Sequence, residues 1–187
     1  MTRQKILKVA HRSLKKQGPG ALSLRQIAGE VGITPMAVYR HFRNKDDLLD
    51  ALVADGFAKW EQYLAEAVRA DNPWQRLERA LLAYADFALA EHRMFELMFM
   101  VPRARVPTAP GSLSTTPSPS FGSVIASVRQ LLGSEDVSDT LLLAWASAHG
   151  VICLHFSGRF GFEVALFRRE YGRVVQRLLG LLRLSAK

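Results

Sequence analysis

The sequence predicts an all-α protein with three short helices at its N-terminus and a larger helical part after them. Two observations support this fold class. Apolar residues recur every three or four positions through most of the chain, which is the spacing of one face of an α-helix. Capping residues and helix-ending glycines also divide the chain into segments of helical length. The hydrophobic content of 49% is enough for a packed core.

The first predicted helix covers residues 2 to 17 and is marked by its apolar spacing and by its end. Ile6, Ala10 and Leu14 lie four residues apart, so they share one face. Gly18 follows, and a glycine is the usual end of a helix because it adopts a left-handed conformation without strain.

The second predicted helix opens with a capping box. Ser23 is followed three residues later by Gln26, so that each side chain can bond the backbone N–H of the other residue. Ile27 and Val31 lie on the inner face. Gly32 ends the helix after about two turns.

The third predicted helix spans only residues 34 to 42, which is too short to be stable alone. Thr34 is placed to cap it, and Pro35 has the backbone angle of a first helical residue. Val38 and Phe42 are predicted to dock on the first two helices. Two short helices joined by a glycine-containing turn form a helix-turn-helix, whose second helix enters the major groove of DNA.

Positive charge is concentrated in the same part of the chain. Residues 1 to 47 contain ten Lys and Arg residues but only three Asp and Glu residues, so they hold nearly all of the net charge of +8. A solvated basic face is one interpretation of this concentration. A module that binds a polyanion is the other, and the helix pattern favours it.

The stretch SLRQIAGEVGITPMAVYRHFRNKDDLLDAL resembles the N-terminal domain of the TetR family of bacterial transcriptional regulators. The shared pattern comprises the two short helices, Gly32 in the turn, Tyr39-Xaa-His41-Phe42, and Asn44-Lys45 before a pair of leucines. The resemblance extends over about residues 5 to 52 without a gap. Further on, WASAHG, residues 145 to 150, is similar to the Trp-His-Gly signature of one C-terminal class in this family.

The resemblance implies a set of DNA-contacting residues. Tyr39 and His41 would bind phosphate or sugar, and Lys45 would hold a phosphate where a helix N-terminus already favours anions. Five further residues occupy positions that face the groove in the family. Thr34, which caps the third helix, is predicted to contact DNA with them. The predicted set is Arg25, Thr34, Pro35, Met36, Ala37, Tyr39, Arg40, His41 and Lys45.

The chain after residue 47 is predicted to be helical throughout, apart from one loop. Residues 102 to 120 contain five Pro, one Gly, four Ser and three Thr, which predicts a mobile loop. We therefore predict a DNA-binding domain over residues 1 to 47 and an effector-binding and dimerisation domain over residues 48 to 187. The predicted helices of the second domain cover about residues 44 to 70, 72 to 91, 92 to 101, 118 to 133, 137 to 157 and 163 to 184.

The apolar residues of the second part have two possible uses besides an ordinary core. The last two predicted helices would form a four-helix bundle with a second copy of the chain, with Gly150 allowing close approach and the apolar face of the final helix shared between subunits. Met and aromatic side chains would line a cavity for a mostly apolar effector. The predicted effector-binding residues are Tyr84, Phe87, Phe95, Met98, Phe99, Trp145 and His149.

Other classes of protein fit the sequence poorly. We find no catalytic set, no metal-ligand spacing and no phosphate loop, and the single cysteine, Cys153, permits no internal disulfide. Residues 140 to 158 carry no charge, but Ser147, His149, His155 and Ser157 interrupt them, so we predict a helix buried on all sides rather than a membrane span. No secretory signal is apparent, so we expect a cytoplasmic protein without cofactors.

The sequence therefore predicts a homodimeric repressor that binds a palindromic operator in double-stranded DNA and is released by a small, mostly apolar effector. Repression and effector release come from the family resemblance. The alternative is a DNA-binding architectural protein without an effector site, which would bind DNA with no sequence preference.

Overall fold

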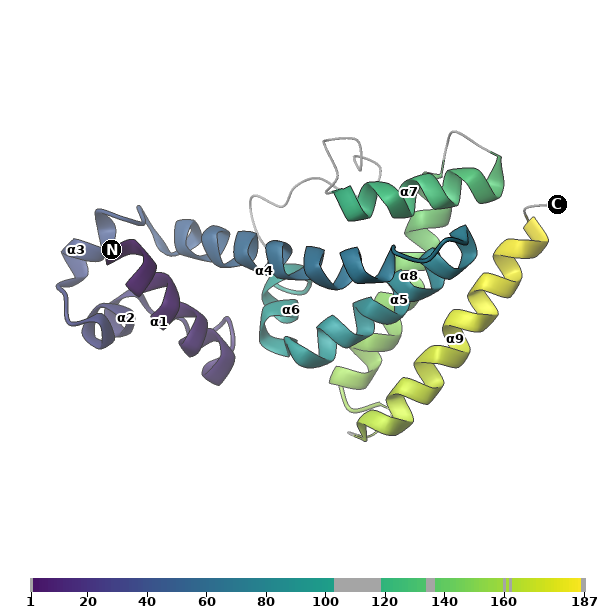
Figure 1. Ribbon diagram of the computed structural model, residues 1–187. Coiled ribbons are helices and arrows are strands. Elements are labelled where there is room, and N and C mark those ends of the chain that lie inside the picture. Colours follow the sequence, from purple (N-terminus) through teal and green to yellow (C-terminus); the bar gives the residue numbers. More distant parts are fainter. Residues whose placement is uncertain (1, 103–118, 134–136, 160, 162, 186–187) are drawn as a thin grey trace. The chain divides into compact units, whose positions relative to one another are not determined.

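The computed structural model describes residues 2–102, 119–133, 137–159, 161 and 163–185. Every regular element in these ranges is an α-helix, as Figure 1 shows, which confirms the predicted fold class. The chain forms two compact units: Met1–Trp60 with Ala90–Arg103, and Glu61–Leu89 with Ala104–Lys187. The predicted domain boundary after residue 47 falls within the first unit, near the start of a long helix, and stays a prediction.

The first unit holds the three predicted N-terminal helices and two more. They are α1 (Thr2–Gln17), α2 (Leu24–Val31), α3 (Pro35–Tyr39), the first part of α4 (Lys45–Ala67) and α6 (His92–Phe99). The second unit holds the end of α4, nearly all of α5 (Pro73–Ala90), and α7 (Pro119–Leu132), α8 (Ser138–Phe156) and α9 (Val164–Ser185). The predicted loop over residues 102 to 120 lies almost entirely outside the described residues.

The predicted caps define the helix boundaries of the first unit. The Ser23 Oγ accepts a bond from the Gln26 N–H at 3.5 Å, and the Thr34 Oγ1 accepts one from the Ala37 N–H at 3.2 Å. Gly32 adopts a φ of 77°, the left-handed conformation that ends α2. These bonds satisfy backbone donors that a helix end leaves without a partner.

The third helix is even shorter than predicted, because it ends at Tyr39 and not at Phe42. The N–H groups of His41 and Phe42 both bond to the carbonyl of Val38, which closes the helix in a tight turn. Val38 is 0% exposed and Phe42 is 2% exposed, so both pack in the core of the unit. The prediction that these two side chains hold α3 from behind is confirmed.

Helix α6 packs in the first unit through a glycine of α4. A Cβ atom on Gly56 would lie 2.6 Å from the Met98 Sδ and 2.8 Å from the Met94 Sδ, so any larger residue there would require these side chains to shift. Arg93 of the same helix lies against Gly18, at the end of α1. An ion pair between Lys59 and Glu91 also ties α4 to the start of α6.

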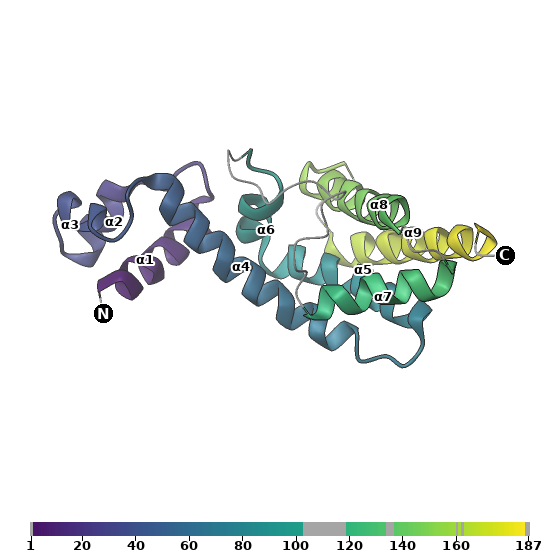
Figure 2. The same ribbon diagram turned by 90° about the horizontal axis from the view of Figure 1, so that it is seen from above.

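In the second unit, α8 packs against both α7 and α9. Figure 2 shows α8 running beside α9. The Tyr171 hydroxyl of α9 donates to the Leu81 carbonyl of α5 at 2.6 Å. The ring of His155 stacks on the ring of Phe167 with centroids 4.2 Å apart. The core of this unit therefore includes side chains from both of the last two helices.

Burial in the single chain bears on two predictions about these helices. The apolar face of α9 was expected to be shared between subunits, and this stays a prediction: Val175 and Leu178 are buried within the chain at 2% and 7% exposure, whereas Leu181 and Leu184 are 64% and 71% exposed. Helix α8 was expected to be buried on all sides, but Leu143 is 53% exposed and Leu154 is 45% exposed. The prediction for α8 is therefore wrong, because the single chain leaves one apolar face of that helix exposed.

Candidate functional site

The predicted DNA-contacting residues lie together on the first unit, and they lie at its surface. Eight of the nine are exposed, and Ala37 is half-buried. Met36 is 71% exposed and Tyr39 is 48% exposed, which are large values for side chains with so much apolar surface. The buried Val38 and Phe42 orient the short helix so that these side chains face solvent.

Several cations of this unit are already engaged by other side chains. Arg12 pairs with Glu30 at 2.8 Å, and Arg43 makes a two-pronged pair with Asp47 at 2.7 and 2.8 Å. The guanidinium of Arg3 lies 5.0 Å from the centre of the Phe42 ring. These three cations therefore contribute to the structure of the module itself.

Arg25, Arg40 and Lys45 differ from them, since none forms an ion pair with another residue in the described part of the chain. Lys45 is the first residue of α4, and Asn44 caps that helix by accepting a bond from the Asp47 N–H at 2.8 Å. The partial positive charge of a helix N-terminus adds to that of the lysine. The N-terminal end of α4 therefore has the features of a phosphate-binding position.

Comparison with known protein families identifies the module. The family described as bacterial regulatory proteins, tetR family, matches residues 6–52. A second family, the tetracyclin repressor-like C-terminal domain, matches residues 77–180, which is more than half of the chain. The chain belongs to the TetR family of transcriptional regulators.

Individual TetR-family proteins resemble the chain to different extents. The class A tetracycline repressor from transposon 1721 of Escherichia coli is 35% identical over 91 residues, which span 44% of this chain and 41% of the repressor. The chain thus spans less than half of that relative. The HTH-type transcriptional regulator Mb1846 of Mycobacterium bovis is 25% identical over 193 residues, which span 86% of this chain and 82% of that regulator.

Solved structures show the same fold. A protein of unknown function from Rhodococcus sp. RHA1 aligns with a TM-score of 0.71 at 26% identity, covering 98% of this chain and 94% of that one. A TetR variant from Acinetobacter baumannii AYE, solved in complex with minocycline, aligns with a TM-score of 0.63 at 20% identity, covering 96% of each chain. At 20% identity, the similarity to the Acinetobacter baumannii structure shows a shared fold and nothing more.

The predicted effector-binding residues of this TetR-family regulator fall into two groups. Phe95, Met98 and Phe99 belong to α6 in the first unit, where the rings of Phe95 and Phe99 lie 5.0 Å apart. Phe95 is 0% exposed, and so is Phe87 in the second unit, so both are core residues in this structure. The structure does not test whether a ligand displaces any of them, and their effector role stays a prediction.

Tyr84, Trp145 and His149, which lie in the second unit, form a hydrogen-bonded network that the sequence analysis did not predict. The indole Nε1 of Trp145 donates to the hydroxyl oxygen of Tyr84 at 3.0 Å, and that oxygen lies 3.0 Å from the Nδ1 of His149. An indole N–H can only donate, so the Tyr84 oxygen accepts from Trp145. The Tyr84 hydroxyl donates to the Nδ1 of His149 when the neutral imidazole carries its proton on Nε2, and it accepts from that nitrogen in the other tautomer.

Burial explains the ionisation of this network. Desolvation raises the pKa of the Tyr84 phenol well above its ordinary value, and it lowers the pKa of His149. Both groups are thus favoured in their neutral forms. The sequence analysis placed Tyr84, Trp145 and His149 in one predicted effector-binding set, but it did not predict the hydrogen bonds among them.

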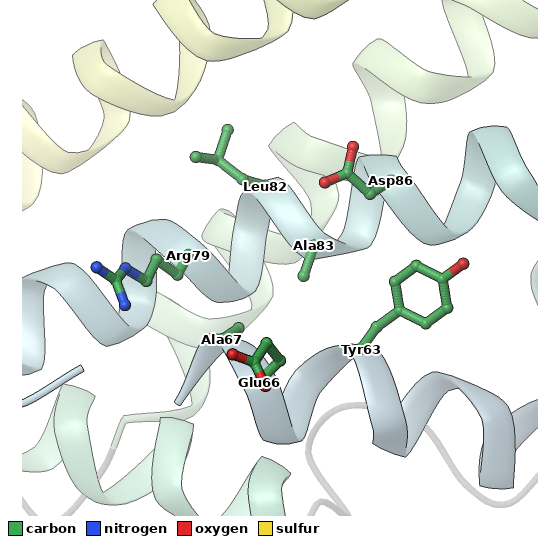
Figure 3. A pocket seen from close by; sticks show the side chains of 7 residues that line it. All are labelled: Tyr63, Glu66, Ala67, Arg79, Leu82, Ala83 and Asp86. Atoms are coloured by element: carbon green, nitrogen blue, oxygen red, sulfur yellow. The ribbon is translucent and has the colours of Figure 1, made fainter. Parts of the chain in front are cut away.

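The second unit also carries an open recess of about 360 Å³ between α4 and α5. Figure 3 shows its lining, in which Tyr63 and Glu66 of α4 lie opposite Arg79 and Asp86 of α5. The other lining residues are Ala67, Leu82 and Ala83. None of the predicted effector-binding residues lines it, so this recess is not the predicted effector site.

Proposed function

We propose that this regulator is a homodimeric repressor that binds a palindromic operator and is released by a small, mostly apolar effector. The observation that carries the proposal is the surface of α3 and its neighbours. A helix of five residues is held by Val38 and Phe42, while Arg40 and Lys45 remain available as cations beside it. This arrangement fits a helix that enters the major groove while nearby cations hold the phosphates on either side.

The exposed apolar face of α8, which includes Leu143 and Leu154, supports a dimer. Leu143, Gly150 and Leu154 are spaced along one side of the helix, and all three are exposed. Apart from the helix's own backbone, no atom of the described residues lies within 4 Å of a Cβ built on Gly150. The helix is long and apolar enough to cross a membrane by composition, and 28% of its most apolar window is buried in the chain. A second copy of the same helix would cover this face. The resulting dimer would place two α3 helices, one from each subunit, on one DNA duplex.

Repression and effector release are supported by the relatives. The chain is similar to a tetracycline repressor of Escherichia coli and to the transcriptional repressor BepR of Brucella suis, to which it is 29% identical over 94 residues. The Acinetobacter baumannii relative was solved with minocycline bound. An operator on the chromosome requires a protein in the cytoplasm, and effector binding would shift the dimer to a conformer whose reading helices no longer match the DNA.

Replacing Lys45 with alanine should test the DNA contact. We expect Lys45→Ala to lower the slope of log affinity against log salt concentration by about one, because one phosphate contact releases about one counterion. Arg43→Ala is the matched control, since it removes the same charge from a side chain that Asp47 already holds. Its slope should change less. Equal slopes for wild type and Lys45→Ala on a mixed-sequence duplex of about 40 base pairs would reject the assignment.

A further inference from the structure

The exposed side of α3 presents two different chemistries one helical turn apart. Met36 is an apolar side chain at 71% exposure, and Arg40, four residues later, is an exposed guanidinium. Arg40 keeps a helical backbone conformation, with φ of −69° and ψ of −19°, so the two residues lie on the same side of the helix. Val38, between them in sequence, points into the core.

Each of these side chains suits one kind of base edge. The major groove presents hydrogen-bonding atoms on every base, but the 5-methyl group of thymine is its one apolar group. A methionine side chain is flexible and apolar, so it can pack on such a methyl group. A guanidinium can instead bond the O6 and N7 of guanine together.

We propose, on the basis of the operator-binding function proposed above, that Met36 contacts the methyl group of a thymine in each half-site, near a guanine contacted by Arg40. Four residues of helix rise about 6 Å, and successive base pairs are separated by about 3.4 Å. The thymine and the guanine therefore lie about two base-pair steps apart. The sequence preference of the operator then follows from two side chains of opposite chemistry.

Removing the methyl group alone tests this contact. The wild-type protein is first used to select its preferred site from a random duplex library. Each thymine of the selected half-site is then replaced in turn by deoxyuracil, which lacks only the methyl group. We expect one replacement to weaken binding about fourfold per half-site, the effect of one buried methyl group.

Two variants connect that thymine to Met36. Met36→Ala should weaken binding to the thymine site and bind the thymine and deoxyuracil sites equally. Met36→Leu is the matched control, because it keeps an apolar side chain of similar size, and it should still prefer thymine. Arg40→Ala should lose the preference for guanine about two steps away and keep the preference for thymine.

The outcomes separate this proposal from the function on which it rests. If a palindromic site is selected but no deoxyuracil replacement weakens wild-type binding, the Met36 contact is overturned and operator binding stands. A selected half-site without thymine would overturn it in the same way. If no site is selected at all, operator binding fails and the contact fails with it. Should Met36→Ala not fold, the deoxyuracil series with the wild-type protein decides alone.

Discussion

Leu143→Glu combined with Leu154→Glu should convert the protein from a dimer to a monomer and abolish its binding to a specific operator. Both leucines lie on the exposed apolar face of α8, at 53% and 45% exposure. A dimer formed through this face would bury both carboxylates without a partner in each subunit, and breaking or burying such charges typically costs several kcal/mol. The fold of the single chain should survive, because the substituted side chains are exposed in it.

Light scattering measures this result directly. The double variant should show about half of the wild-type mass, with an unchanged far-ultraviolet circular dichroism spectrum and weak, non-specific DNA binding. Leu82→Glu is the matched control, since Leu82 is exposed on α5. It should remain a dimer. A wild-type protein that is monomeric at micromolar concentration, or a double variant that still dimerises, would refute the α8 interface.

Gly56→Val should destabilise the first unit by about 1–3 kcal/mol, the usual cost of overpacking a close contact. A Cβ at this position would meet the Met98 Sδ at 2.6 Å, the Met94 Sδ at 2.8 Å and the Met94 Cγ at 3.0 Å. Met94 is buried at 7% exposure. The added methyl groups should therefore force α6 away from α4.

Urea unfolding measures the loss, and two further variants identify its cause. Met98→Ala in the Gly56→Val background should restore part of the lost stability, because it removes the nearest clashing atom. Gly29→Val is the matched control, since a Cβ on Gly29 meets nothing within 4 Å. It should not destabilise the protein by overpacking. Unchanged unfolding of Gly56→Val would show that α6 is not seated on Gly56.

The N-terminal module could be predicted closely because its determinants are local. The caps at Ser23, Thr34 and Asn44 each act on a backbone N–H three residues away, so their spacing is visible in the sequence. The buried pair Val38 and Phe42 follows from helical spacing. The family resemblance then supplied the roles of the exposed residues around them.

The rest depended on contacts between distant segments. The Trp145–Tyr84 hydrogen bond joins residues 61 positions apart, and the Gly56–Met98 contact joins two separate helices. The exposed face of α8 was mistaken for a buried one because the helix carries almost no charged residues by which that face could be recognised. Which helix faces are covered depends on the packing of the whole unit, and spacing along one helix does not determine it.

Selection of bound sequences from a random duplex library tests the central claim most directly. A dimer with two reading helices predicts an enriched palindrome whose half-site centres lie about 34 Å apart, or one turn of DNA. The Leu143→Glu and Leu154→Glu double variant should enrich no palindrome in the same experiment. Enrichment of a single unpaired half-site by the wild-type protein, or of no sequence at all, would contradict the account of a dimeric operator-binding repressor.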